Sequence, residues 1–144
     1  MDHSPHARAS LTRQAISATL HCLTGCAIGE ILGMVVGTAL GLSDLLTIVV
    51  AVLLAFVFGY SLTIRPVLAS GLALSAAIPV AFAADTVSIA VMEVVDNGVV
   101  LLVPGAMDVG LGHWLFWLSL AGSLVVAFAA AVPVNRWLIG RGKG

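Results

Sequence analysis

Residues 20–42 read LHCLTGCAIGEILGMVVGTALGL, and Glu30 carries the only Asp, Glu, Lys or Arg side chain in this stretch. A helix needs about 20 mostly apolar residues to cross the hydrocarbon core of a bilayer. The stretch is long enough and apolar enough to do so. It therefore predicts a transmembrane helix and, with it, an all-α integral membrane fold.

The composition of the whole chain agrees with this prediction. Of the 144 residues, 60% are hydrophobic and 9% are charged, whereas soluble domains average about half and about a quarter. A fold of this length has too little interior to hide so much apolar surface from water. The composition therefore excludes a soluble enzyme. The net charge of −1 argues against nucleic acid as a partner, and two cysteines are too few for a disulfide-stapled secreted fold.

Four stretches have the length and composition of membrane spans: residues 20–42, 45–64, 84–103 and 113–134. They predict a compact bundle of four transmembrane helices, with a short helix over residues 67–83 on the cytoplasmic side. In the alternative, residues 67–83 cross the bilayer as a fifth span. The predicted organisation is a tail, one polytopic membrane domain and a second tail: residues 1–18, 19–138 and 139–144.

The basic residues lie only in the tails or at one internal junction: Arg8, Arg13, Arg65, Arg136, Arg141 and Lys143. Cytoplasmic segments of membrane proteins carry an excess of Lys and Arg. The distribution therefore predicts that both termini are cytoplasmic and that the number of spans is even. This favours four spans over five.

Glycine recurs at every fourth position of the first span, at Gly25, Gly29, Gly33, Gly37 and Gly41. At about 100° per residue, this spacing keeps the glycines on one stripe of a helix. Small residues in such a stripe let another helix backbone approach closely in lipid. We therefore expect the glycine ladder to be a helix-packing face through which the chain assembles as a homo-oligomer or packs on a larger membrane protein.

A second ladder of the same spacing contains Cys22, Cys26, Glu30 and Met34, and His21 precedes it. Thiolate and thioether groups are soft ligands that favour Cu(I). Cysteine and methionine are also ordinary apolar fillers, so packing alone is the competing explanation. The ladder indicates a candidate metal site at the mouth of the span.

The third span repeats the pattern with Asp85, Met92, Glu93 and Asp96. Glu30 and Glu93 lie eight residues beyond Cys22 and Asp85, which predicts matching depths on two helices that run in the same direction. No Lys or Arg lies inside any predicted span. Buried carboxyls without a basic partner must be protonated, hydrated or bound to a cation. The predicted metal ligands are His21, Cys22, Cys26, Glu30, Met92, Glu93 and Asp96.

Several residues are secondary candidates: His3, Met34, Asp85, Met107, Asp108 and His113. A histidine at position three suits square-planar Cu(II) or Ni(II), although a solvated tail is the simpler interpretation. In the outer loop, Met107, Asp108 and His113 suggest an external capture site. The simpler interpretation is a plain turn followed by a histidine at the membrane interface.

Four segments carry a resemblance to a known family: HCLTGCAIGE (21–30), ADTVSIAVME (84–93), PGAMD (104–108) and PVNRW (133–137). Together they resemble a bacterial membrane-protein family known only as domain of unknown function 4396. The resemblance implies a small multi-pass protein of the bacterial inner membrane. It also implies an association with metal handling, especially of copper, but no established activity.

The favoured functional prediction is therefore a membrane protein that binds or transports a soft transition-metal ion, Cu(I) before Zn(II). Copper or zinc is the expected ion, and no organic cofactor is predicted. The alternative is a non-catalytic accessory or scaffold subunit that packs on a larger transporter or oxidase through the glycine ladder. No catalytic motif is present, so an enzyme using Glu30 and Glu93 as an acid–base pair is the weakest hypothesis.

Overall fold

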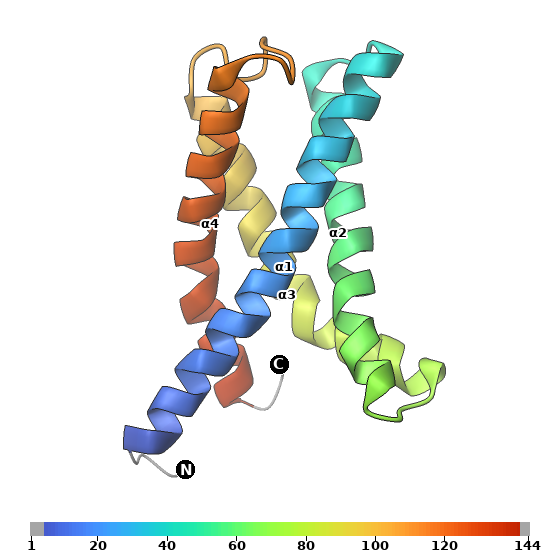
Figure 1. Cartoon of the computed structure of the whole chain (residues 1–144), viewed down its shortest axis with the longest axis vertical. Helices are drawn as coiled ribbons and strands as arrows, with labels where there is room; N and C mark the ends of the chain where they lie inside the picture. Colours follow the sequence, from blue (N-terminus) through green and yellow to red (C-terminus); the bar gives the residue numbers. More distant parts are fainter. Residues whose placement is uncertain (1–4, 142–144) are drawn as a thin grey trace.

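The structure, a computed structural model, describes residues 5–141, except the side chains of a few residues: Pro5, Ala7, Val67, Val80, Ala81 and Ala84. It consists of four helices in a bundle, α1 (Pro5–Leu40), α2 (Asp44–Ala69), α3 (Leu74–Leu102) and α4 (Trp114–Gly140). Figure 1 shows that α1 begins and α4 ends at the same end of the molecule. The prediction of an all-α bundle is confirmed.

Three helices of the described chain are long and apolar enough to cross a membrane: Arg8–Leu40, Asp44–Pro66 and Trp114–Gly140. The remaining helix, α3, is 29 residues long but carries Asp85, Glu93 and Asp96. Its length matches a span, and its carboxyls set it apart from the other three helices. The three apolar helices indicate a membrane protein. The prediction of four spans requires that α3 also crosses the bilayer, with its carboxyls facing the interior of the bundle.

The distribution of side chains is the reverse of that in a soluble bundle. Large apolar side chains cover the outside, and Leu102 and Val94 are 83% and 74% exposed. The hydroxyl side chains of Ser88 and Ser123 are fully buried between the helices. Soluble proteins bury their large aliphatic residues and expose most serines. The outer surface of this bundle is therefore suited to lipid.

The glycine ladder packs against α2 of the same chain. Each glycine from Gly25 to Gly37 faces one small or polar residue of α2, in the pairs Gly25–Gly59, Gly29–Ala55, Gly33–Ala51 and Gly37–Thr47. A Cβ atom added to Gly25 would lie 2.6 Å from the Cα atom of Gly59. The glycine ladder is therefore a packing face within the chain, and the expectation that it joins two copies or a larger partner does not fit this arrangement, because α2 covers it.

The last glycine of the predicted ladder has another role. Gly41 follows the end of α1, has φ +62° and has open space around it. This left-handed conformation favours glycine and reverses the chain between α1 and α2.

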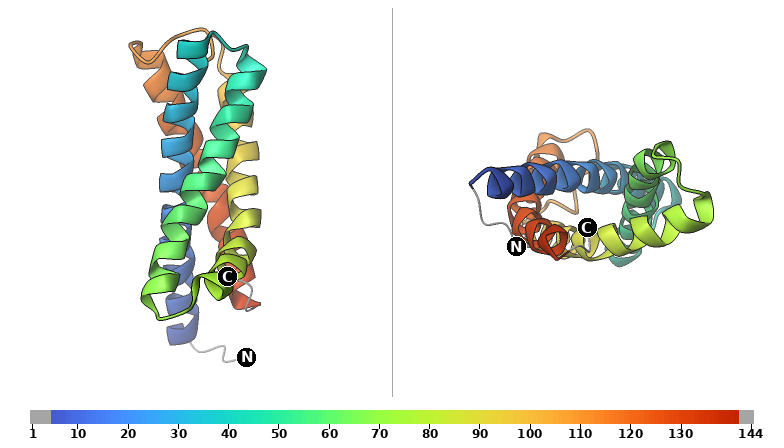
Figure 2. Two further views of the ribbon diagram at one scale, coloured as in Figure 1. Left: turned by 90° about the vertical axis from the view of Figure 1, so that its right-hand side faces the viewer. Right: turned by 90° about the horizontal axis from the view of Figure 1, so that it is seen from below.

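Residues 67–83 do not form the separate short helix that their sequence predicts. They include the end of α2, a turn at Gly71 with φ +94°, and the first turns of α3, which continues unbroken to Leu102. The views in Figure 2 show these first turns of α3 running across the lower end of the bundle. Pro79 lies within them, and proline removes a helical hydrogen bond and permits bending.

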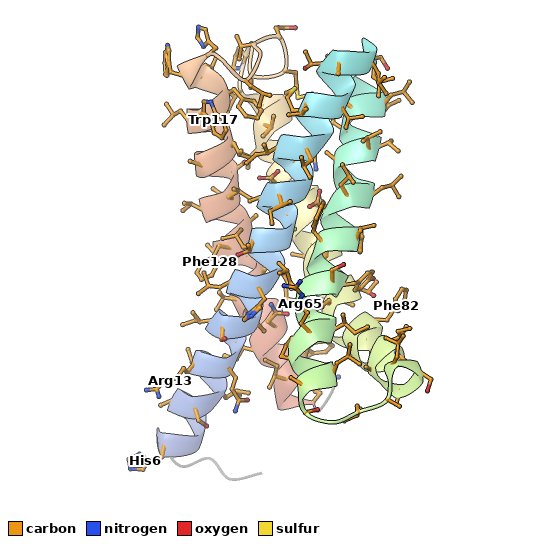
Figure 3. The ribbon with its side chains drawn as sticks, turned by 45° about the vertical axis from the view of Figure 1, so that its right-hand side comes forward. His6, Arg13, Arg65, Phe82, Trp117 and Phe128 are labelled. Atoms are coloured by element: carbon orange, nitrogen blue, oxygen red, sulfur yellow. The ribbon has the colours of Figure 1, made fainter. Side chains whose placement is uncertain are left out.

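The two ends of the bundle differ in chemistry. Arg13 and Arg65 lie in the lower half of the molecule in Figure 3, whereas Trp117 lies near the opposite end.

Trp114 and Trp137 at the two ends of α4 are 67% and 53% exposed. Exposed tryptophans at both ends of a span are typical of residues that sit at the membrane–water interface.

Candidate functional site

Most of the candidate ligands line the contact between α1 and α3, two helices that run in the same direction (Figure 1). The thiol of Cys22 donates to Oδ1 of Asp85 with a separation of 3.5 Å. One turn further along α1, the Sγ atom of Cys26 lies 3.9 Å from the Sδ atom of Met92. The parallel register that the sequence spacing predicts is therefore present.

The sulfur atoms lie deep inside the bundle. Cys22 and Cys26 are each 1% exposed, and Met92 is fully buried. Both cysteines have free thiols. The Cys26 thiol also interacts with the carboxyl of Glu93. The four groups place two thiols, a thioether and an acid within about two helical turns.

Further along the same interface, the carboxyls of Glu30 and Glu93 meet the side chain of Asn97. Its Nδ2 atom lies 3.4 Å from Oε1 of Glu30, 3.2 Å from Oε2 of Glu93 and 2.9 Å from the Glu93 carbonyl oxygen. The Glu30 carboxyl also interacts with those of Glu93 and Asp96. Asn97 thus links Glu30 of α1 to Glu93 of α3.

These carboxyls are poorly satisfied by the protein. Glu93 and Asp96 are 5% and 1% exposed. Oε1 of Glu93 and both carboxyl oxygens of Asp96 have no hydrogen-bond partner in the described part of the chain. The sequence contains no Lys or Arg between positions 14 and 64 or between 66 and 135. A buried acid in this state calls for a proton, water or a cation.

Below the sulfur atoms, three helices are held together by one amide. The Nδ2 atom of Asn135 on α4 donates to Oγ1 of Thr19 at 2.8 Å and to Oγ of Ser88 at 2.9 Å. All three residues are buried. Ser88 also interacts with the Cys22 thiol, so this amide lies next to the sulfur level. It closes the polar interior toward the end of the bundle that carries the chain termini.

At the other end, a partly enclosed cavity of about 30 Å³ adjoins the carboxyls. Glu30 and Asn97 line it, together with Met34 of α1, Met107 of the α3–α4 connection and Ser119 of α4. The polar interior therefore extends from Asn135 past the sulfur atoms and carboxyls to this cavity.

The structure brings together most of the primary candidates but leaves out His21. His21 is exposed, and its Nδ1 atom lies 2.9 Å from the Ser17 carbonyl oxygen. Among the described residues, no three His, Cys, Asp or Glu side chains form a ready-made metal-chelating group. A metal ion at this site would therefore use the Met92 thioether or require side-chain rearrangement.

The secondary candidates divide in the same way. Met34 and Met107 face one cavity, whereas Asp108 and His113 are exposed. The Nδ1 atom of His113 accepts a hydrogen bond from the Leu115 amide at 3.1 Å and caps α4. His113 therefore has the structural role of a helix cap, and neither it nor Asp108 borders the cavity that Met107 lines. His3 lies outside the described residues.

Sequence reasoning missed the neutral polar residues of the interior. Asn97, Ser88, Ser123 and Asn135 are all buried or half-buried and lie beside the candidate ligands. The available signal was the presence of amides and hydroxyls in otherwise apolar helices, such as the pair Ser119 and Ser123 one turn apart. Such residues in membrane helices usually face other helices rather than lipid.

The chain belongs to the family described as Domain of unknown function (DUF4396), which matches residues 12–144. This confirms the family resemblance seen in the sequence. No curated protein and no solved structure matches the chain.

Proposed function

We propose that this protein binds Cu(I) between α1 and α3 and conducts it through the polar interior of the bundle. The observation that carries the proposal is the Cys26–Met92 pair, whose sulfur atoms lie 3.9 Å apart in a fully buried position. An ion bonded to both at about 2.3 Å would subtend an S–metal–S angle of about 115°, close to trigonal geometry. The pair suits a shared soft ion without a large backbone movement.

The chemistry of the neighbouring groups favours Cu(I) over Zn(II). Structural zinc sites are tetrahedral and are built from thiolates and imidazoles. Here the histidine that precedes Cys22, His21, is exposed, and the group opposite Cys26 is a thioether. Thiolate and thioether together are ligands that select Cu(I). Because a thiol must lose its proton to bind metal, binding releases protons, and Glu93 beside Cys26 is a nearby acceptor.

The order of groups along the bundle supports conduction as well as binding. A cation moving between the ends would meet Cys22 with Asp85, then Cys26 with Met92, and then the carboxyl group at Glu30. Each of these steps offers a soft or negatively charged ligand inside an apolar layer, where a bare ion is costly. In this proposal the protein lies in the bacterial inner membrane with both termini cytoplasmic, as the basic residues indicate.

Metal analysis of the purified protein tests the binding step. Protein purified in mild detergent without chelators should carry or take up Cu(I), and the Cys22→Ser/Cys26→Ser variant should lose binding at the sulfur atoms, because hydroxyls are poor ligands for a soft ion. Thr24→Ala, an exposed change on the same helix, is the matched control. Sub-stoichiometric copper and zinc, together with wild-type behaviour of the double serine variant, would refute the proposal.

Transport in proteoliposomes tests the conduction step. Glu93→Gln keeps the size of the side chain and removes its charge, so it should spare capture of Cu(I) and block passage. Asp44→Asn, at an exposed acid in the first turn of α2, should leave passage unchanged. Equal passage by the wild type and Glu93→Gln would contradict this role for Glu93.

The scaffold alternative predicts a different result. It rests on a glycine face that α2 already covers in this chain. It requires recovery of the protein only with a larger complex, and no metal in the isolated chain. Co-purification under mild conditions therefore separates the two functions.

A further inference from the structure

The cavity beside the carboxyls contains features that packing alone does not explain. Ser119 is 7% exposed, and its hydroxyl oxygen has no hydrogen-bond partner in the described part of the chain. The same cavity is lined by the Glu30 and Asn97 side chains. Empty cavities in proteins are apolar, whereas cavities with unsatisfied polar groups hold water or another polar occupant. This cavity is therefore expected to hold water or another polar occupant.

The lining indicates the charge of that occupant. Among the residues that border the cavity, Glu30 is the only ionisable one, and the other polar groups are neutral amides and hydroxyls. No basic side chain of the described residues borders the cavity, so an anion would lack a partner there. A cation is the charged ligand that this lining favours.

Two thioethers from distant parts of the chain indicate the kind of cation. Met34 lies one turn beyond Glu30 on α1, and Met107 lies in the connection between α3 and α4, yet both line this one cavity. Only four methionines occur in the chain, and three of them, including Met92, border the polar interior. Thioethers are soft ligands that suit Cu(I) and are poor ligands for hard ions such as Mg²⁺.

We propose that Met34, Met107 and Glu30 form a second, outer Cu(I) site, which loads the sulfur pair of Cys26 and Met92. The cavity volume of about 30 Å³ has room for a single ion. Glu30 connects the two sites, because it lines the cavity and interacts with Glu93, which in turn interacts with Cys26. This inference rests on the proposed function, and it adds a second ion per chain and a direction of approach from the α3–α4 connection.

Counting bound Cu(I) in matched variants tests the outer site separately from the sulfur pair. Under ascorbate, with a chromogenic Cu(I) chelator as competitor, the wild type should bind two ions per chain. Met34→Leu/Met107→Leu keeps the side chains apolar and similar in size and should bind one ion. Cys22→Ser/Cys26→Ser should keep the outer ion and lose the inner one.

The outcomes of this count separate the two proposals. If the double leucine variant binds as many ions as the wild type, the outer site is overturned while the sulfur pair stands. If the double serine variant binds as many ions as the wild type and the leucine variant does not, the sulfur pair is overturned while the outer site stands. If the wild type binds no Cu(I), both are overturned. Circular dichroism and size-exclusion profiles equal to those of the wild type establish that each variant is folded.

A spectroscopic measurement identifies the ligands directly. In selenomethionine-labelled protein carrying Cys22→Ser, Cys26→Ser and Met92→Leu, X-ray absorption at the selenium edge should show a copper neighbour. That signal should disappear on adding Met34→Leu and Met107→Leu. Ser119→Ala should leave the signal intact. Loss of the ion in Ser119→Ala, with retention in the leucine variant, would identify an oxygen site for a hard cation and overturn the proposal.

Discussion

The contact of Gly33 with α2 gives the most quantitative prediction for this fold. An alanine Cβ at Gly33 would lie 2.5 Å from the Cα atom and 2.8 Å from the backbone nitrogen of Ala51, and closest of all to the Ala51 Cβ atom. Atoms of real structures do not approach so closely, and backbone atoms cannot rotate away as a flexible side chain does. Gly33→Ala must therefore push α1 and α2 apart.

Two opposing effects set the magnitude. Overpacking of a tight interior costs about 1–3 kcal/mol of stability. Replacing a helical glycine with alanine returns about 0.4–1 kcal/mol by restricting the unfolded chain. Because the obstructing atoms belong partly to the backbone of Ala51, we expect the cost to exceed the gain. The predicted loss in free energy of unfolding is about 1–2 kcal/mol.

Unfolding in mixed detergent micelles, followed by circular dichroism, measures this difference. Gly122→Ala is the matched control: it lies within α4, has open space around it, and should equal or exceed the wild type in stability. Ala51→Gly added to Gly33→Ala removes the nearest obstructing atom, so it should recover part of the loss. If Gly33→Ala proves as stable as Gly122→Ala, the close contact between α1 and α2 is refuted.

Three further predictions concern the α1–α4 and α2–α3 contacts and the topology. Asn135→Ala removes two hydrogen bonds between helices and should lower the free energy of unfolding by about 1–2 kcal/mol in the same assay. An unchanged free energy of unfolding would show that those bonds do not form. Tyr60→Phe removes the 2.8 Å hydrogen bond to Thr86 but keeps the stacking of the ring on Phe82. The free energy of unfolding should therefore fall by only about 0.6 kcal/mol. A larger fall than that of Asn135→Ala would contradict this prediction. A reporter fused at Gly144 should read cytoplasmic, and a periplasmic reading would refute the prediction of an even number of spans with both termini cytoplasmic.

The parts of the site that the sequence predicts are those fixed by helical periodicity. The equal spacing from Cys22 to Glu30 and from Asp85 to Glu93 is sufficient to place acids at matching depths on parallel helices. The contacts of Cys22 with Asp85 and of Asn97 with Glu30 confirm that register. Periodicity applies here because each set of residues lies within one unbroken helix.

The parts that sequence reasoning missed depend on which helices become neighbours. The glycine ladder indicates close packing but does not identify the partner, and α2 of the same chain proved to be that partner. Asn135 is far from Thr19 and Ser88 in the sequence, and only the return of α4 beside α1 and α3 brings the three together. The turn at Gly71 is also followed directly by α3, so no separate short helix forms. Non-local pairing of this kind leaves little trace in local sequence patterns.

The glycine ladder and the Cys22–Met34 ladder occupy two different faces of α1, and each face contacts a different helix. Gly25 and Cys26 are neighbours in sequence, but a helix turns about 100° per residue, so the glycine faces Gly59 of α2 while the thiol faces Met92 of α3. The close backbone contact with α2 supplies packing chiefly through the small residues Gly59, Ala55 and Ala51. Unsatisfied carboxyls at the α3 interface reduce stability, and the α2 interface offsets that cost. It follows that changes on the glycine face should alter stability more than Cu(I) binding, whereas removal of the Glu93 charge should maintain or raise stability while it blocks passage.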